Sequence, residues 1–438
     1  MAKPLVAVVG RSNVGKSTFF NRICGKRIAI VKDTPGVTRD RIYADAEWCG
    51  YNFTLIDTGG IEPDHPDEMF AEIRRQAETA IELAKVIIFM VDGKSGLIPT
   101  DMDVADILRA SKKPVILAVN KLDNNETDTL YDFYQLGLGE PVPISCEQKK
   151  GLGDLLDEVV SNFEKTENEA NEGLKIAFVG RPNVGKSSLV NRLLGAPRVI
   201  VSDVSGTTRD AIDTPFTYEG VKYTLIDTAG IRRKRGIEDE SVERYGVMRS
   251  IAAISRADVV FIVIDASEEI SEQDVRIAGM VHEEGKPSVI VVNKWDKLEK
   301  DTHTINQFRD KIAEQLSFMS YFQAEYVSAV TGQRTNRLID LAETVYDRAS
   351  KRISTGTLND VVREAVTVTE PPASSGRRLK ILYATQASVN PPTFIFFVND
   401  EKLVHFSYKR YLENSLRRAF DFSGTPMRMK FVNRREDK

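Results

Sequence analysis

The nine residues GRSNVGKST at positions 10–18 return, with two changes, as GRPNVGKSS at positions 180–188. Shifting the chain against itself by 170 residues also aligns Thr38 with Thr208 and Asp57 with Asp227. Solenoid repeats are only about 20–50 residues long, so this period is that of a whole domain. The chain therefore contains a duplicated domain.

Each copy alternates apolar runs with amphipathic segments, the pattern of a parallel sheet flanked by helices. The apolar runs lie at 4–10, 52–60, 86–93 and 114–120 in the first copy, and at 174–180, 222–230, 259–266 and 287–293 in the second. We therefore predict two consecutive α/β domains.

A third, smaller α+β domain is predicted after residue 353. A helical pattern at 357–366, strand-like runs at 377–388 and 393–400, a helical pattern at 405–420 and a last strand at 427–435 give the order α-β-β-α-β. The stretch FEKTENEANEG between the copies has the polar, acidic composition of a linker. The predicted boundaries are 1–162, 163–173 (linker), 174–353 and 354–438.

Composition narrows the class of protein. The 438 residues are 42% hydrophobic and carry a net charge of −4, and no apolar run is long enough to cross a bilayer. The start of the chain lacks the features of a signal peptide, so we expect a cytosolic protein. Residues 354–438 hold 14 Lys and Arg against 9 Asp and Glu. This basic excess suggests an anionic partner such as RNA, although a merely soluble surface is an alternative.

Both repeated stretches satisfy the pattern G-x-x-x-x-G-K-[ST] between a strand and a helix, where backbone N–H groups can face a phosphate. We expect Lys16 and Lys186 to contact β- and γ-phosphate oxygens, and Ser17 and Ser187 to bind Mg²⁺. The predicted phosphate-binding residues are Gly10, Arg11, Ser12, Asn13, Val14, Gly15, Lys16, Ser17 and Thr18, and Gly180, Arg181, Pro182, Asn183, Val184, Gly185, Lys186, Ser187 and Ser188.

A D-x-x-G pattern ends one apolar run in each copy, which places Asp57 and Asp227 at a sheet edge where carboxylates can bind Mg²⁺. Thr38 and Thr208 lie between the two motifs, and we expect them to contact the γ-phosphate and the metal. The predicted residues of the D-x-x-G motif are Asp57, Thr58, Gly59, Gly60 and Ile61, and Asp227, Thr228, Ala229, Gly230 and Ile231.

The third motif is NKLD at 120–123 and NKWD at 293–296. A carboxylate can accept hydrogen bonds from guanine N1–H and its N2 amino group, whereas adenine N1 is itself an acceptor. Asp123 and Asp296 are therefore predicted to select GTP over ATP. The predicted base-binding residues are Asn120, Lys121, Asp123 and Ser145, and Asn293, Lys294, Asp296, Ser328 and Ala329.

With these motifs in the same order in both copies, the chain resembles the Der (EngA) family of bacterial GTPases, which have two G domains and a C-terminal KH-like domain. The segments 379–400 and 405–420 extend the resemblance to nearly the whole chain. The resemblance implies GTP, GDP and Mg²⁺ as ligands and a role in assembling the large (50S) ribosomal subunit, with ribosomal RNA as the main partner. We expect a monomer that binds neither DNA nor a membrane.

Two positions bear on hydrolysis. Asn13 and Asn183 occupy the place that helps to bind K⁺ in related potassium-activated GTPases, so they are predicted to be catalytic together with Lys16, Lys186, Thr38 and Thr208. The alternative is that the two asparagines only cap the phosphate loop. Ile61 and Ile231 stand where Ras-like enzymes have a glutamine, so intrinsic hydrolysis should be slow.

The chain departs from the family's pattern at Ser12, where proline is usual, and at Cys146, where a small residue is expected after Ser145. The third domain lacks a GxxG sequence, so ordinary KH-type binding of a single strand is not expected.

The segment RRKR at 232–235 is basic, whereas its counterpart EPDHPDE at 62–68 is acidic. The two nucleotide states are therefore expected to be recognised by different surfaces, unless these are simply solvated charge runs. Rival functions are a potassium-dependent GTPase of RNA modification or processing, a membrane or cytoskeletal GTPase, and a purely structural RNA-binding module.

Overall fold

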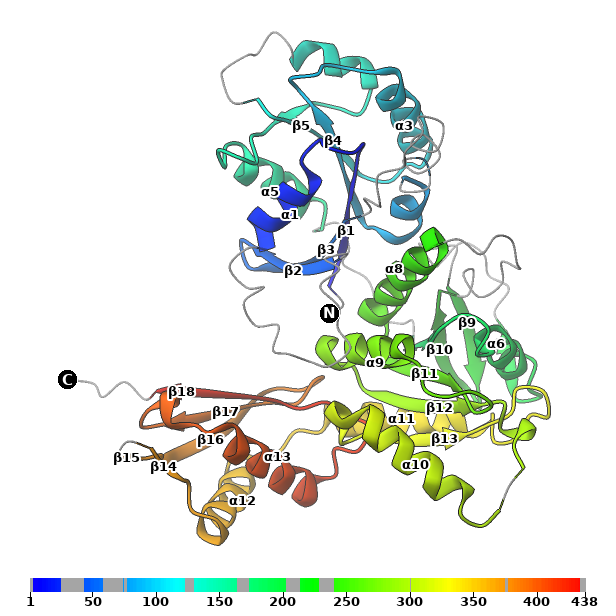
Figure 1. Cartoon of the computed structure of the whole chain (residues 1–438), viewed down its shortest axis with the longest axis vertical. Helices are drawn as coiled ribbons and strands as arrows, with labels where there is room; N and C mark the ends of the chain where they lie inside the picture. The colour runs from blue at the N-terminus through cyan, green and yellow to red at the C-terminus, as the bar shows by residue number, and fades with distance from the viewer. Residues whose placement is uncertain are drawn as a thin grey trace. The chain divides into compact units, whose positions relative to one another are not determined.

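The computed structural model describes residues 3–24, 43–57, 74, 77–122, 130–163, 173–201, 213–227, 240–299, 301–374 and 377–433. The chain forms two compact units, each built from two stretches of sequence (Figure 1). The units are Met1–Asn171 with Gly236–Ser255, and Glu172–Arg235 with Arg256–Lys438. The second unit thus holds both the second phosphate loop and the C-terminal domain.

The first unit contains a six-stranded sheet in the order β2-β3-β1-β4-β5-β6. All neighbouring pairs are parallel except β2 with β3, so the predicted parallel sheet is confirmed and gains an antiparallel edge strand. Its strands are β1 (Leu5–Val9), β2 (Tyr43–Trp48), β3 (Tyr51–Asp57), β4 (Val86–Asp92), β5 (Val115–Asn120) and β6 (Val142–Pro143). The helical segments described before the linker include α1 (Lys16–Cys24), α3 (Pro99–Ala110), η2 (Tyr131–Leu136) and α5 (Leu152–Ser161).

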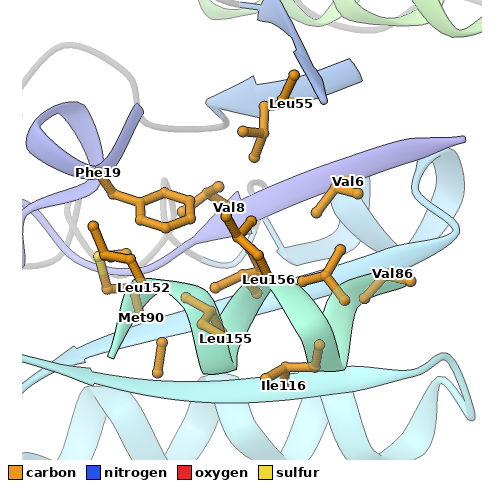
Figure 2. Close-up of a cluster of buried hydrophobic side chains, with 14 of the residues drawn as sticks. Val6, Val8, Phe19, Leu55, Val86, Met90, Ile116, Leu152, Leu155 and Leu156 are labelled. Atoms are coloured by element: carbon orange, nitrogen blue, oxygen red, sulfur yellow. The ribbon is translucent and has the colours of Figure 1, made fainter. Parts of the chain in front are cut away.

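Successive residues of β1 pack into opposite cores, because side chains alternate across a strand. Val6 and Val8 join Phe19 of α1 and Leu155 of α5 on one face, as Figure 2 shows, whereas Ala7 and its neighbour Val9 pack into the core on the other face. A strand buried on both faces must be apolar throughout, which explains the unbroken run LVAVV. The phosphate loop follows directly from this strand.

The second unit repeats the arrangement in a seven-stranded sheet of order β13-β12-β11-β7-β10-β9-β8. Strand β9 is antiparallel to both of its neighbours, and the remaining pairs are parallel. The strands are β7 (Leu174–Val179), β8 (Val199–Val201), β9 (Thr214–Tyr218), β10 (Val221–Ile226), β11 (Val259–Asp265), β12 (Ser288–Asn293) and β13 (Ala324–Tyr326). Its helices include α6 (Lys186–Leu194), α9 (Glu272–Glu284), η3 (Trp295–Lys297), α10 (Thr304–Gln315), η4 (Ser317–Met319) and α11 (Arg337–Ser350). Helix α8 (Glu240–Arg256) belongs to the first unit up to Ser255.

The C-terminal elements, orange to red in Figure 1, follow the predicted order α-β-β-α-β. They are α12 (Thr355–Val368), β14 (Ala373–Ser374), β15 (Arg377–Arg378), β16 (Ile381–Ser388), β17 (Thr393–Val398), η5 (Glu401–Leu403), α13 (Phe406–Phe420) and β18 (Arg428–Asn433). The run predicted as one strand from residue 377 is divided, because Arg377 and Arg378 pair with β14 and the N–H of Lys380 donates to the side chain of Asn399.

Backbone hydrogen bonds join these C-terminal elements to the second G domain. The N–H of Ser288 in β12 donates to the carbonyl of Gly424 over 2.8 Å, and the N–H of Gly424 donates to the carbonyl of Tyr321 over 2.7 Å. The Arg417 guanidinium lies 4.7 Å from the centre of the Tyr321 ring. Among the helices that the structure describes, none is long and apolar enough to cross a membrane.

Candidate nucleotide-binding sites

Both phosphate loops adopt the same strained backbone path. Asn13 and Asn183 each have φ 65°, and Gly15 and Gly185 have φ 103° and 96°. A Cβ atom at Gly15 would lie 2.2 Å from Nδ2 of Asn120, so only glycine fits there. Alternation of left-handed residues with residues of negative φ turns successive N–H groups into one concavity, the geometry of an anion-binding nest.

Ser12 and Pro182 occupy the same place in the two loops. Proline fixes φ, and serine does not. Because the residues that follow them have the same φ, serine allows the path that proline imposes. The departure at Ser12 therefore leaves the loop conformation unchanged.

The lysine of each loop lies over the loop's own carbonyls. Lys16 Nζ donates to the carbonyls of Gly10 and Arg11 over 2.5 and 2.8 Å. Lys186 makes the equivalent bonds over 2.6 and 2.7 Å. Burial lowers the pKa of Lys186 to about 8, against the opposing charges of two nearby carboxylates, Asp274 and Asp227. The lysine ammonium is thus held beside the loop carbonyls, where a bound anionic phosphate would favour its charged form and raise its pKa again.

Asp57 and Asp227 lie at the carboxyl ends of β3 and β10. Asp57 is buried, with 8% of its surface exposed, and the backbone N–H of Asp227 donates to the side chain of Asp213 over 3.1 Å. Ser17 and Ser187 are the second residues of α1 and α6, next to the lysines. Thr38, Thr208, residues 58–61 and residues 228–231 lie outside the described residues.

The asparagine of each NKxD motif contacts both the phosphate loop and the loop behind the base. Asn120 Nδ2 donates to the carbonyl of Val14 over 2.7 Å, and Asn120 Oδ1 accepts from the N–H of Cys146 over 3.0 Å. Asn293 makes the same contacts with Val184 and Ala329 over 2.8 and 3.1 Å. Only the backbone of Cys146 is used, so its side chain does not disturb this arrangement.

The serines of the loops behind the base are fully buried and shape the turns. Ser145 Oγ accepts from the N–H of Gln148 over 3.2 Å, and Ser328 Oγ accepts from the N–H of Thr331 over 3.1 Å. The two loops therefore share one conformation at the predicted base-binding positions.

The rest of the second NKxD motif is ordered by its tryptophan. The Trp295 side chain is buried against Phe308 and Tyr326, and the backbone N–H of Trp295 donates to the carbonyl of Val327 over 3.1 Å. Asp296, the next residue, is exposed in η3. Its counterpart Asp123 lies outside the described residues.

Comparison with known proteins finds relatives along nearly the whole chain. A family model described as "50S ribosome-binding GTPase" matches residues 5–121 and again 175–294, and one described as the KH-domain-like C-terminal domain of EngA bacterial GTPase enzymes matches residues 352–431. The chain is 57% identical over 439 residues to GTPase Der of Clostridium tetani, with 100% of both chains covered. It is 57% identical over 431 residues to GTPase Der of Alkaliphilus oremlandii, with 98% of both covered.

The chain belongs to the GTPase Der family. It is a GTP-binding enzyme that hydrolyses GTP, and the predicted architecture of two P-loop G domains followed by a KH-like domain is confirmed. GTP or GDP and Mg²⁺ are the ligands that this family membership implies.

The residues present fit a magnesium nucleotide. A glycine-lined concavity, a serine hydroxyl and a carboxylate provide the N–H donors and hard oxygen ligands that phosphate and Mg²⁺ require. Ser17 and Asp57, or Ser187 and Asp227, would hold the ion, which supplies positive charge to the β- and γ-phosphates. Lys16 and Lys186 would add further positive charge to the bound phosphates.

Two acidic pairs in these sites were not predicted. Asp92 and Asp265 end β4 and β11 and form ion pairs with Lys121 and Lys294 of the NKxD motifs. Asp101 and Asp274, on α3 and α9, face the arginines of the phosphate loops. Their signal in the sequence was the recurrence of both aspartates in both copies, nine residues apart each time.

Proposed function

We propose that this protein hydrolyses GTP at both sites and that its nucleotide state controls binding to the 50S ribosomal subunit during assembly of that subunit. Support comes from the family description that names the 50S ribosome, from the KH-like domain, and from the basic excess of residues 354–438. Basic domains of this kind bind the phosphates of RNA, so ribosomal RNA is the proposed contact.

The observation that carries this proposal is that strand β12 connects the second nucleotide site to the KH-like domain. Strand β12 begins at Ser288, whose N–H donates to the carbonyl of Gly424, and it ends at Asn293, which contacts the phosphate loop. In α11, the carbonyl of Val345 accepts a hydrogen bond of 3.3 Å from the hydroxyl of Thr425. Strand β12 and helix α11 of the second G domain are therefore hydrogen-bonded to the KH-like domain, and through them nucleotide binding can influence RNA binding.

At each site, the proposed roles follow the motif. Lys16 and Lys186 stabilise charge on the phosphates, Thr38 and Thr208 contact the γ-phosphate, and Asp123 and Asp296 select guanine. Asn13 and Asn183 bind K⁺, which supplies positive charge beside the phosphates. Hydrolysis is thus expected to be faster in KCl than in NaCl of equal ionic strength, and Asn183→Ala should remove the difference at the second site.

The protein is proposed to act as a cytosolic monomer. Sedimentation of the purified chain with isolated 50S subunits tests the main proposal, with GDP, a non-hydrolysable GTP analogue, or no nucleotide present. We expect retention with the analogue and loss of retention in the Lys186→Ala variant. Lys311→Ala, which changes an exposed lysine of α10, is the matched control.

Absence of retention in every nucleotide state, with GTP binding intact, would contradict the ribosomal role and favour another RNA-processing or RNA-modification step. Identical defects in the Lys16→Ala and Lys186→Ala variants would contradict a division of labour between the two sites.

A further inference from the structure

The arginine of the second phosphate loop is held by two carboxylates from outside the loop. Arg181 Nε lies 3.2 Å from Oδ2 of Asp274 at the start of α9, and its Nη2 lies 2.6 Å from Oε2 of Glu268. Glu268 lies in the segment between β11 and α9. The side chain of Arg181 therefore connects the phosphate loop to the structure that follows the strand-final Asp265.

The first copy repeats this contact with one carboxylate fewer. Arg11 Nε lies 3.8 Å from Oδ1 of Asp101, and Arg11 Nη2 donates to the hydroxyl of Ser95. Ser95 and Glu268 are equivalent, since each lies three residues after the aspartate that ends the preceding strand. At this position the first copy has the neutral hydroxyl of Ser95, and the second copy has the carboxylate of Glu268.

These contacts are buried and incompletely satisfied. The Asp101 and Asp274 residues are 2% and 3% exposed, and both arginine side chains are 19% exposed. Among the described residues, the Nε atom of each arginine and one oxygen of each aspartate have no hydrogen-bond partner. A buried ion pair of this kind is often no more stable than an apolar pair of similar volume. Its presence in both copies therefore points to a role other than stability.

The backbone of the same arginines indicates what this role is, because it contacts the lysine of each phosphate loop. The carbonyls of Arg11 and Arg181 accept hydrogen bonds from Lys16 and Lys186, the lysines that face the phosphates. Fixing the arginine side chain outside the loop also restricts the position of this carbonyl. Each arginine therefore connects the phosphate-binding lysine to α3 or α9.

We propose that Arg11 and Arg181 are positioning residues that hold the phosphate loop in its binding conformation, and that Glu268 gives the second site a more firmly held loop than Ser95 gives the first. The phosphate-binding N–H groups of the second site then need less ordering when GTP binds, so its affinity for nucleotide is higher.

Exchange of the residues at positions 95 and 268 tests the inference. Glu268→Ser is made with the first site inactivated by Lys16→Ala, and Ser95→Glu with the second inactivated by Lys186→Ala. We measure kcat and KM for GTP and the dissociation constant of a fluorescent GDP analogue. Glu268→Ser should raise KM and the dissociation constant about two- to fivefold, and Ser95→Glu should lower them by a similar factor, because a partly exposed ion pair contributes modestly. The melting temperature should not change, since both positions are exposed.

Glu269→Ser is the matched control, because Glu269 is also exposed and forms no ion pair among the described residues. Equal KM values for Glu268→Ser and Glu269→Ser would overturn the proposed difference between the sites. Arg181→Gln should raise KM about tenfold or more, since it removes the cation beside the buried carboxylate of Asp274. Unchanged KM and kcat in a folded Arg181→Gln variant would overturn the positioning role itself.

Discussion

The side-chain amide of Asn293 donates a 2.8 Å hydrogen bond to the carbonyl of Val184, so the base-recognition motif and the phosphate loop of the second site are joined directly. The oxygen of the same amide accepts from the N–H of Ala329 in the loop behind the base. One side chain thus fixes three segments that are distant in sequence. Asn120 does the same in the first site.

Replacement of this asparagine should disrupt the whole second site. Asn293→Ala leaves the buried Val184 carbonyl and Ala329 N–H without partners, at a cost of about 1–3 kcal/mol for each group. Affinity for a fluorescent GDP analogue, measured with the first site inactivated by Lys16→Ala, is expected to fall at least about tenfold. Asn306→Ala in the exposed part of α10 is the control, and equal affinity in the two variants would contradict this role.

Lys121 of the first NKxD motif forms an ion pair with Asp92. Burial raises the pKa of the Asp92 carboxyl, but hydrogen bonds from the Lys121 ammonium and from the N–H groups of Ser95 and Lys94 outweigh this and bring the pKa below its usual value. Asp92→Asn should release Lys121 and weaken GDP binding about two- to tenfold with little effect on kcat. The measurement is a GDP titration with Lys186→Ala in place. Asp103→Asn, on the exposed face of α3, should leave affinity unchanged.

The first site should depend on pH through Asp101. Burial raises the pKa of this carboxyl from 3.8 to about 6, while the Arg11 guanidinium opposes the shift and the Asp92 charge adds to it. Between about pH 4 and pH 6 the folded protein therefore holds a proton that the unfolded chain has released. The contribution of Asp101 to the free energy of unfolding then decreases as the pH rises through this window, and the charged pair with Arg11 is complete only above it.

We expect KM for GTP at the first site to fall as the pH rises from about 5 to about 7, with a midpoint near 6. Asp101→Asn should remove the inflection. The profile is measured with Lys186→Ala in place and at constant ionic strength. Persistence of the inflection in the Asp101→Asn variant would assign it to another group.

The contact between the second G domain and the KH-like domain can be tested at Gly424. This residue has φ 75°, and a Cβ atom there would lie 2.6 Å from Cγ1 of Val345 and 3.1 Å from the carbonyl oxygen of Ser288. Gly424→Ala should therefore destabilise this contact by about 1–3 kcal/mol. Thermal unfolding and limited proteolysis of the full chain measure the effect.

Gly356→Ala is the matched control, because its Cβ would meet nothing within 4 Å and the residue lies in α12. A melting temperature lowered equally by both substitutions would show that the Gly424 contact has no special importance.

Local signals made much of this fold predictable. The phosphate loops and NKxD motifs each occupy a few consecutive residues, and the strands before them are buried on both faces and so are continuously apolar. The edge strands were not predicted, because they are partly polar: β2 has the sequence YADAEW, with only Ala46 fully buried. Their place depends on pairing with β3, which no local pattern specifies.

The ion pairs of the sites were missed for a related reason. Arg181 and Asp274 are 93 residues apart, and each alone is an ordinary charged residue of a loop or of the first turn of a helix. Asp274 also completes a capping box with Ser271, which accounts for its residue type without any contact to the phosphate loop. Only the tertiary structure shows that the two side chains meet.

The number of guanine nucleotides bound per chain tests the central claim, that both copies of the repeated loop form working sites, most directly. Equilibrium dialysis with labelled GDP and Mg²⁺ measures this number for the unaltered chain and for the Lys16→Ala and Lys186→Ala variants. We expect two nucleotides on the unaltered chain and one high-affinity nucleotide on each variant. A single nucleotide on the unaltered chain, lost completely in one variant and unaffected in the other, would contradict this claim.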